Sequence, residues 1–159
     1  MSYLIWKFLH VASVIVFVGN ITSGVFWGAY ANKSRDFSVI ASTFEGIVRS
    51  DRVLTMPGVI GIIVSGVVAA IVGGLPILGT GWILWGIALF ALAGFVFGSR
   101  VAPLQRQIVA VARSADSGET SRQAYEQLYR SWVRWGWVGL LAPVAAVIIM
   151  VVKPQLPAF

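Results

Sequence analysis

Four long blocks of apolar residues, almost free of charge, dominate the pattern along the chain. They cover residues 4–30, 56–78, 82–99 and 135–152, and only the first is interrupted, by Lys7 and His10. A helix needs about 20 apolar residues to cross the hydrocarbon core of a bilayer. Spanning strands would need apolar–polar alternation, which the blocks lack, so helices must satisfy the backbone hydrogen bonds in lipid. The pattern predicts an all-α polytopic membrane protein, a bundle of four transmembrane helices.

The two long links between these blocks also have helical patterns. In residues 37–54 the apolar side chains lie at helical spacing opposite a polar face, at Phe37, Ile40, Phe44, Ile47 and Val48. We expect an amphipathic cytoplasmic helix here, lying at the membrane interface or packed under the bundle. We expect a cytoplasmic helical hairpin over residues 100–134, with its turn at residues 114–120. These helical extensions leave residues 1–159 as a single domain.

Small residues recur every three or four positions along several of the blocks. They are Gly61, Ser65, Ala69 and Gly73 in the second block, Gly94 and Gly98 in the third, and Gly139, Ala142 and Ala146 in the fourth. Such stripes allow helices to approach closely, either within one chain or between copies in a homo-oligomer. Pro57 is expected to open or kink the second helix, and Pro103 to bend the third.

The distribution of charge predicts how the bundle is oriented. Only 11% of the residues are charged and 58% are hydrophobic, and the net charge is +6. Ten of the twelve Lys and Arg residues lie in or beside residues 31–55 and 100–134, and Lys7 and Lys153 are the exceptions. The positive-inside rule places these two segments in the cytoplasm, which gives an N-out/C-out orientation. Because the basic residues flank apolar spans, they indicate contact with membrane lipids and not with nucleic acid.

His10 is the single histidine, and it lies within the first apolar block. On a helical wheel it shares one small and polar face with Ser13, Phe17, Asn20 and Gly24. An ionisable group at membrane depth is expected to face the bundle interior or a cavity. Two interpretations remain open: His10 and Asn20 form hydrogen bonds between helices, or His10 binds a metal or haem iron.

Met150 is expected at a similar depth to His10, on an inward face of the last helix. His and Met form a known axial pair for haem iron, and the same two donors suit copper. Lys7 and Lys153 lie three residues from His10 and Met150, where an ammonium group can reach a haem propionate or anchor the helix at the interface. The chain has no cysteine, which excludes disulfides and covalently attached haem.

The six acidic residues all fall outside the apolar blocks, at Asp36, Glu45, Asp51, Asp116, Glu119 and Glu126. Proton-driven transport normally needs a carboxylate within the membrane, so this distribution argues against a secondary transporter. The chain also has no P-loop, dinucleotide-binding glycine motif, nucleophile elbow or zinc-protease motif. Whether the protein is an enzyme therefore stays open.

Several short motifs carry a resemblance to a known family. They are Leu9-His10-Val11 and Val18-Gly19-Asn20 in the first helix, residues 52–57, Trp132-Val133-Arg134 and residues 150–154. With these motifs the chain resembles a four-span bacterial membrane family of unknown function, which is similar to the copper-resistance D proteins and more distantly to HemJ-type protoporphyrinogen oxidases. The resemblance implies a multi-pass protein of the bacterial cytoplasmic (inner) membrane. It also implies a haem-binding first-helix histidine, here His10, or the passage of copper.

Three hypotheses follow from these residues. The first is a redox or electron-transfer protein that binds b-type haem through His10, with Met150 and Lys7 as further contacts and Ser13 and Asn20 on the same face. The second is copper handling by His10 and Met150. The third is a non-enzymatic membrane subunit or scaffold that packs as a homo-oligomer or with a partner in a membrane complex.

Overall fold

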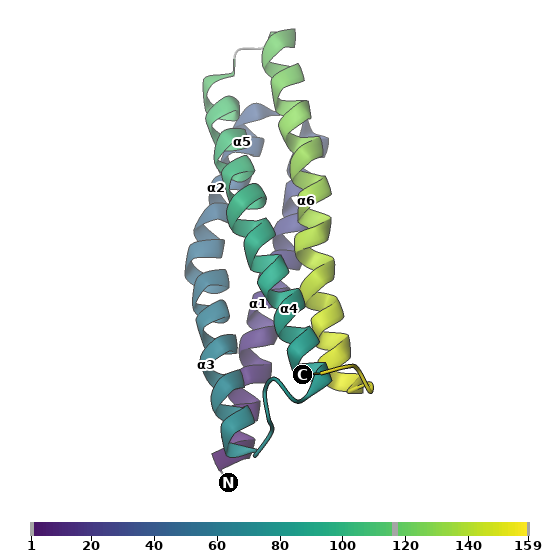
Figure 1. Ribbon diagram of the computed structural model, residues 1–159. Coiled ribbons are helices and arrows are strands. Elements are labelled where there is room, and N and C mark those ends of the chain that lie inside the picture. The colour runs from purple at the N-terminus through teal and green to yellow at the C-terminus, as the bar shows by residue number, and fades with distance from the viewer. Residues whose placement is uncertain (1, 116–117, 159) are drawn as a thin grey trace.

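The computed structural model describes residues 2–115 and 118–158, and in this part of the chain every regular element is helical (Figure 1). The first helix is α1, Ser2–Ser34. The second runs without a break through α2 (Phe37–Ser50), the π-helical turn η1 (Asp51–Thr55) and α3 (Met56–Val72). The third combines α4 (Gly81–Val96), the π-helical turn η2 (Phe97–Val101) and α5 (Ala102–Ser114), and the fourth is α6, Glu119–Val152. All four are long and apolar enough to cross a membrane, which confirms the predicted fold class.

Both termini lie at the same end of this elongated bundle, which we call the terminal end (Figure 1). The α1–α2 and α5–α6 links form the opposite end, which we call the charged end. α1 packs along α3 and α4 along α6, whereas no described residue of α3 has its Cα within 8 Å of α4 or α6. At the charged end α5 packs against both α2 and α6. Two helix pairs near the terminal end thus become one connected bundle near the charged end.

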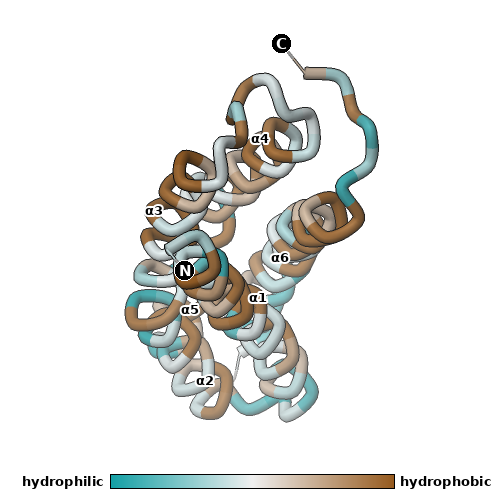
Figure 2. The backbone as a smooth tube through the Cα atoms, turned by 90° about the horizontal axis from the view of Figure 1, so that it is seen from below, coloured by the Kyte–Doolittle hydropathy of each residue, from teal (hydrophilic) through white to brown (hydrophobic). Residues whose placement is uncertain are grey.

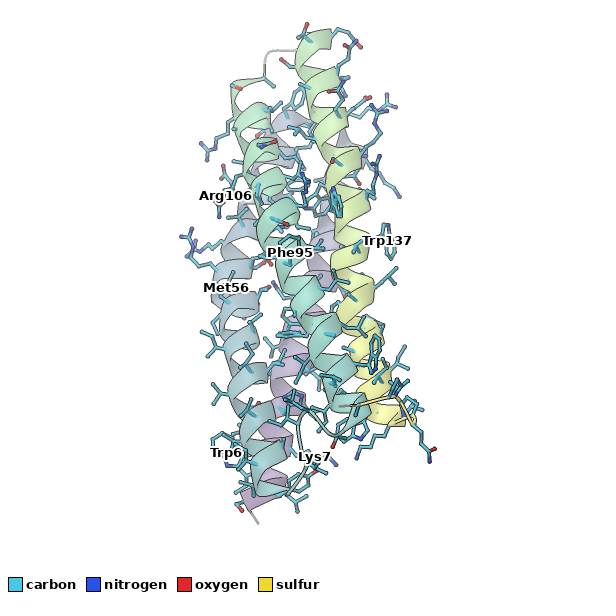
Figure 3. The ribbon with its side chains drawn as sticks, in the orientation of Figure 1. Trp6, Lys7, Met56, Phe95, Arg106 and Trp137 are labelled. Carbon is cyan, nitrogen blue, oxygen red and sulfur yellow. The ribbon has the colours of Figure 1, made fainter. Side chains whose placement is uncertain are left out.

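The surfaces of the helices match a lipid environment. Leu4, Phe8 and Ile15 of α1 are 66%, 68% and 66% exposed. Apolar stretches run along the outward faces of the helices in the view from the terminal end (Figure 2). Trp137 also points away from the bundle (Figure 3). Apolar groups that water would penalise are favourable against acyl chains, so the exposed surface supports an integral membrane protein.

Small residues allow the close approach of α1 to α3. A Cβ atom at Gly58 would lie 3.3 Å from the Cβ of Phe17, and one at Gly66 would lie 2.9 Å from the ring of His10. Gly61 faces Ser13 in the same way. The predicted close packing is therefore confirmed for Gly61 on the second helix. Ser65 contributes differently, because its hydroxyl donates to the Gly61 carbonyl of its own helix.

The hydrophobic core lies at the charged end. Ile40, Phe44 and Ile108 are almost completely buried there, and Trp132 of α6 packs edge-on against Phe44 with ring centroids 5.0 Å apart. The apolar face expected in residues 37–54 supplies the first two of these residues, and it packs against α5 and α1.

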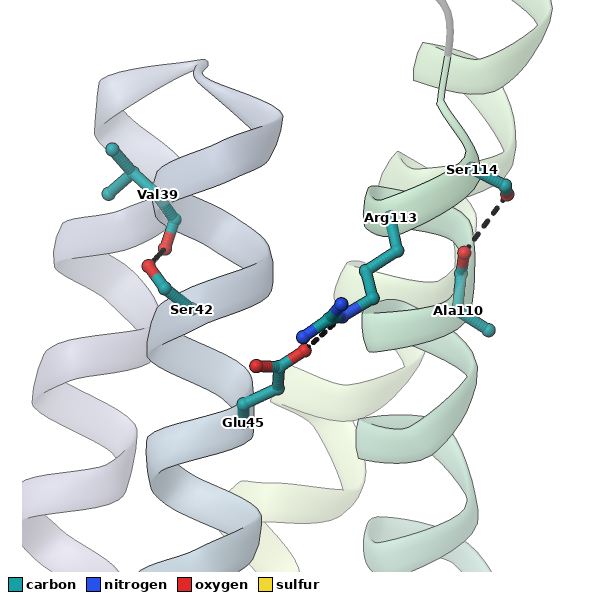
Figure 4. A network of polar contacts seen from close by, with 6 residues as sticks. All are labelled: Val39, Ser42, Glu45, Ala110, Arg113 and Ser114. Atoms are coloured by element: carbon teal, nitrogen blue, oxygen red, sulfur yellow. Dashed lines mark hydrogen bonds and ion pairs between the residues drawn. The ribbon is translucent and has the colours of Figure 1, made fainter.

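Local polar contacts fix the position of α2. Asp36 caps its N-terminus by accepting from the backbone N–H of Ser38 at 2.8 Å. The Glu45 carboxylate pairs with the Arg113 guanidinium across the α2–α5 contact (Figure 4). Arg113 is largely and Glu45 partly exposed to solvent, so this ion pair contributes little stability.

Two expected boundaries need correction. The second span was expected to reach residue 78, but α3 ends at Val72, where Gly74 adopts a left-handed φ of 66° and turns the chain. The hairpin turn was expected at residues 114–120, whereas α5 includes Ser114 and α6 begins at Glu119 with Gly118 in the capping position.

A pair of glycine substitutions tests the packing at the charged end. A Cβ atom at Gly28 would lie 2.6 Å from the buried ring of Trp132, whereas one at Gly46 would meet nothing within 4 Å. Both alanine variants gain similar helix propensity, about 1 kcal/mol. Only Gly28→Ala also overpacks the core, so it should be less stable than Gly46→Ala by about 1–3 kcal/mol. Unfolding of the purified variants in detergent measures this difference, and equal stability would contradict the packing described.

Candidate functional site

Two π-helical turns widen the second and third helices at corresponding places. Each precedes a proline, Pro57 or Pro103, which has no N–H to donate to the carbonyl four residues earlier. The residue before each proline instead donates to the carbonyl five residues back, from Met56 to Asp51 and from Ala102 to Phe97. The prolines thus produce a widened turn in a continuous helix, a feature frequent at functional sites.

A buried carboxylate, Asp51, occupies the first position of η1. Its side chain is 8% exposed. Oδ1 accepts from the Asn20 amide at 3.1 Å and from the Thr55 hydroxyl at 2.9 Å, while the Asn20 amide also donates to the Thr55 oxygen at 2.8 Å. Oδ2 accepts from the Gln105 amide at 3.1 Å. We call Asp51, Asn20, Thr55 and Gln105 the carboxylate cluster, and it joins α1 to the second and third helices.

The carboxylate cluster shows that an acid outside the apolar blocks can still be buried inside the bundle. Asp51 is bonded to Asn20, which belongs to the first apolar block, and it stands where the apolar part of the second helix begins. A sequence signal was present, because Asp51 continues the buried face of α2 at the helical spacing of Phe44 and Ile47. Arg52, the next residue, is exposed, and two adjacent charged residues are typical of a solvent-exposed surface. For this reason the helical spacing of Asp51 with the buried residues of α2 was overlooked.

A cavity of about 250 Å³ lies beside the carboxylate cluster. Its walls come from all four long helices and include Phe17, Asp51, Thr55, Phe90, Gln105 and Trp132. Glycines create much of the space, since a Cβ atom at Gly94, Gly98 or Gly136 would meet nothing within 4 Å. The prediction that Gly94 and Gly98 pack closely on a neighbouring helix is therefore wrong within this chain.

The indole of Trp132 adds an unusual feature to the cavity wall. Trp132 is 3% exposed, and among the described side chains its Nε1–H is the one buried polar group without a hydrogen-bond partner. A buried donor without a partner costs about 1–3 kcal/mol. The cavity thus combines apolar walls with a firmly held carboxylate, and one of its lining residues carries an unpaired buried donor.

The residues proposed from the sequence as one site lie in different places. Asn20 belongs to the carboxylate cluster, ten residues and therefore about 15 Å along α1 from His10. Ser13 lies in the α1–α3 contact, against Gly61. Lys7 lies near the terminal end (Figure 3), less than one helical turn before His10 on α1, so these two residues do stay close together.

His10 itself lies against α3. Its Nδ1 is 3.0 Å from the Ile62 carbonyl, which can only accept, so Nδ1 carries the proton and donates. Met150 belongs to the other helix pair, where its side chain packs on Gly86 of α4. In the described part of the chain, no three His, Cys, Asp or Glu side chains are grouped to hold a metal ion. Ligand binding by His10 and Met150 stays a prediction.

The comparisons with known proteins identify a family. A family described as "Predicted integral membrane protein (DUF2269)" matches residues 4–154, nearly the whole chain, so the chain belongs to this family. No curated protein and no solved structure matches the chain. The expected membership of an uncharacterised membrane family is confirmed, and its likeness to the copper-resistance D and HemJ-type proteins stays a prediction.

A double-mutant cycle tests the carboxylate cluster. Asp51→Leu or Gln105→Leu alone leaves the remaining partner buried without its hydrogen bond, at a cost of about 1–3 kcal/mol. The double variant removes both groups, so its loss should be smaller than the sum of the single losses by about 0.5–3 kcal/mol. Unfolding free energies in detergent measure this coupling.

The exposed Gln107 of the same helix provides the control. Gln107→Leu should change stability by less than about 0.5 kcal/mol, and it should combine additively with Asp51→Leu. Additive losses for Asp51 and Gln105 would mean that the hydrogen bond between them contributes nothing.

Proposed function

We propose that this member of the family of predicted integral membrane proteins binds a small apolar molecule inside its helix bundle. The observation that carries the proposal is that Trp132, whose buried Nε1–H has no hydrogen-bond partner among the described residues, is one of the residues that line the cavity. A ligand with a carbonyl or ether oxygen would supply the missing acceptor. An apolar body would replace the empty space between the helices, a combination typical of small-molecule sites.

The volume of the cavity limits the size of the ligand. An engineered apolar cavity of about 150 Å³ binds benzene. By proportion, about 250 Å³ accommodates roughly ten non-hydrogen atoms, the size of a two-ring system or a short isoprenoid unit. A haem macrocycle is far larger, so this cavity does not fit the haem expected from the sequence.

Asp51 gives the site a second polar contact. Its two oxygens are oriented by Asn20, Thr55 and Gln105, and all these donors are neutral. A carboxylate has about four lone-pair positions, so one is left for a ligand hydroxyl. A ring that carries both a carbonyl and a hydroxyl group, as hydroxy-substituted quinones do, matches the acceptor and donor requirements of Trp132 and Asp51.

A second candidate function is redox chemistry with b-type haem held by His10. The supporting observation is the Nδ1–H···O contact with Ile62, because ligating histidines donate one ring N–H to such an acceptor and bind iron through the other nitrogen. His10 fits as a single axial ligand. Met150 packs on Gly86, in the other helix pair, so a second copy of the chain is the better source of a second ligand. Copper handling by the same donors is the third candidate.

We further propose that the charged end faces the cytoplasm of a bacterium, in its inner membrane. Ten of the twelve basic residues flank the helices at that end, as the positive-inside rule requires. A scaffold role remains the non-enzymatic alternative, in which the exposed apolar faces meet lipids or another subunit and the cavity has no occupant.

The ligand proposal is tested with two probes, 1,4-naphthoquinone and naphthalene, added to the protein in nanodiscs. Trp132→Phe keeps an aromatic ring but removes the Nε1–H, so it should weaken binding of the quinone about fivefold, the effect of a hydrogen bond of about 1 kcal/mol. Binding of naphthalene, which has no acceptor, should hardly change. Calorimetric titration with subtraction of empty nanodiscs gives both affinities.

Two glycine variants locate the binding. Gly136→Leu fills the cavity and should abolish binding of both probes, whereas Gly19→Leu, on the exposed face of α1, should preserve it. If Gly136→Leu binds the quinone like the wild type, the cavity is not the site. A quinone affinity unaffected by Trp132→Phe would refute the role of the indole.

The haem proposal predicts a visible Soret band in protein purified from haem-replete cells, lost in His10→Ala. Because His10 also bonds to α3, Ser13→Ala in the same α1–α3 contact provides the control and should keep the band. Colourless wild-type protein would exclude haem, and metal analysis of the same sample tests copper.

A further inference from the structure

A second cavity lies at the charged end, between the end of α1 and the beginning of α6. Its volume is about 290 Å³. Polar and charged side chains line it: Asn32, Arg35, Arg122, Tyr125, Glu126, Tyr129 and Arg130. We call it the arginine groove. It shares no lining residue with the cavity beside Asp51, so it is a separate feature of the molecule.

The wall of the arginine groove is held in place by contacts of its own. The Tyr125 hydroxyl donates to the Asn32 side-chain oxygen at 2.9 Å, and Tyr125 is 3% exposed. The Arg122 guanidinium lies over the ring of Phe37, 5.5 Å from its centroid, and its Nη2 donates to the Arg35 carbonyl at 3.3 Å. A guanidinium has five N–H donors, so Arg122 keeps donors for a ligand.

Positive charge in the groove exceeds negative charge. Arg122 and Arg130 are eight residues apart and share one face of α6 with Glu126, while Arg35 comes from the α1–α2 link. Within the described residues, none of the three arginines has a carboxylate oxygen within 4 Å, unlike Arg113. Like charges gathered at one place repel each other, and a bound anion would remove this repulsion.

The backbone at Arg35 supplies an independent indication. Arg35 has a left-handed φ of 56° directly after α1, where glycine is the least strained residue. An arginine there accepts backbone strain, and its side chain reaches the groove. A residue other than glycine in a left-handed backbone conformation, with no local contact that compensates for the strain, is typical of a functional position.

We propose that the arginine groove binds a phosphate group. Arginine forks match the oxygens of phosphate, and two tyrosines and an asparagine add neutral hydrogen-bonding groups. The volume leaves room for an organic part beside the phosphate. Arg130 lies five residues, about 7.5 Å along α6, before Trp135, the first residue of the last apolar block. The groove therefore lies close to the expected membrane surface. The phosphate can belong to a lipid headgroup or to a soluble phosphomonoester.

The test uses the full chain in phosphatidylcholine nanodiscs, titrated with inorganic phosphate and with glycerol 3-phosphate. The lipid source is tested in parallel by exchanging a fraction of the phosphatidylcholine for phosphatidic acid and measuring retained lipid by native mass spectrometry. We expect saturable binding of at least one probe. Arg130→Gln and Arg35→Gln should each weaken it tenfold or more, since a charge-assisted bond to phosphate is lost.

Arg106→Gln is the matched control, because Arg106 is exposed at the same end of the bundle and does not line the groove (Figure 3). It should change the affinity less than twofold. Binding of the soluble probes identifies a soluble ligand, and binding of phosphatidic acid alone identifies a lipid headgroup. An equal loss in Arg106→Gln, or no binding of any probe, would overturn the proposal, while circular dichroism of each variant checks that the helices remain intact.

Discussion

The burial of one carboxylate organises the middle of this bundle. Asp51 needs hydrogen bonds because a charged or polar group without partners in an apolar interior is costly. Its partners come from three of the long helices: Asn20 from α1, Thr55 from its own helix and Gln105 from α5. Satisfying these contacts fixes the rotation of each helix about its axis, because another face turned inwards would leave the carboxylate or an amide without a partner. The two helix pairs of the terminal end are thereby held together near the charged end.

The two π-helical turns are the second element of this arrangement. An additional residue in a turn shifts the faces of the helix on either side of it, so the buried face of α2 does not simply continue along α3. With Pro57 and Pro103 two residues after the last residue of each widened turn, Asp51 and Thr55 face α1 and α5 while the residues beyond them pack elsewhere. This local adjustment, together with Gly94, Gly98 and Gly136, leaves the cavity open where large side chains would otherwise interlock.

The sequence predicted the helices well and the site less well, for different physical reasons. Helices were predictable because each depends on the spacing of apolar residues along a continuous stretch of sequence. This holds for the four apolar blocks, for the amphipathic face of residues 37–54 and for the helical extension past Arg100. The inward face of α1 was also predictable, and Asn20 on that face belongs to the carboxylate cluster.

What the sequence could not show depends on contacts between distant residues. Asp51 and Gln105 are 54 positions apart, and neither is unusual beside Arg52 or Arg106. Gly94 and Gly98 have the spacing of a packing motif, but only the position of α6 decides whether a glycine meets a neighbour or a void. His10 and Met150 were grouped by their expected depth and their inward faces, and neither property determines which helix a side chain contacts.

The energetic cost of the cavity strengthens the case for an occupant. An unfilled space of about 250 Å³ between the helices lacks packing contacts for its lining atoms, which lowers the stability of the bundle. Acyl chains of the bilayer can fill such a space and recover much of that energy. They cannot satisfy the indole of Trp132, because the end of an acyl chain accepts no hydrogen bond. An apolar molecule with an acceptor atom would remove both costs at once, which is why Trp132, more than the volume of the cavity, favours a specific ligand over lipid.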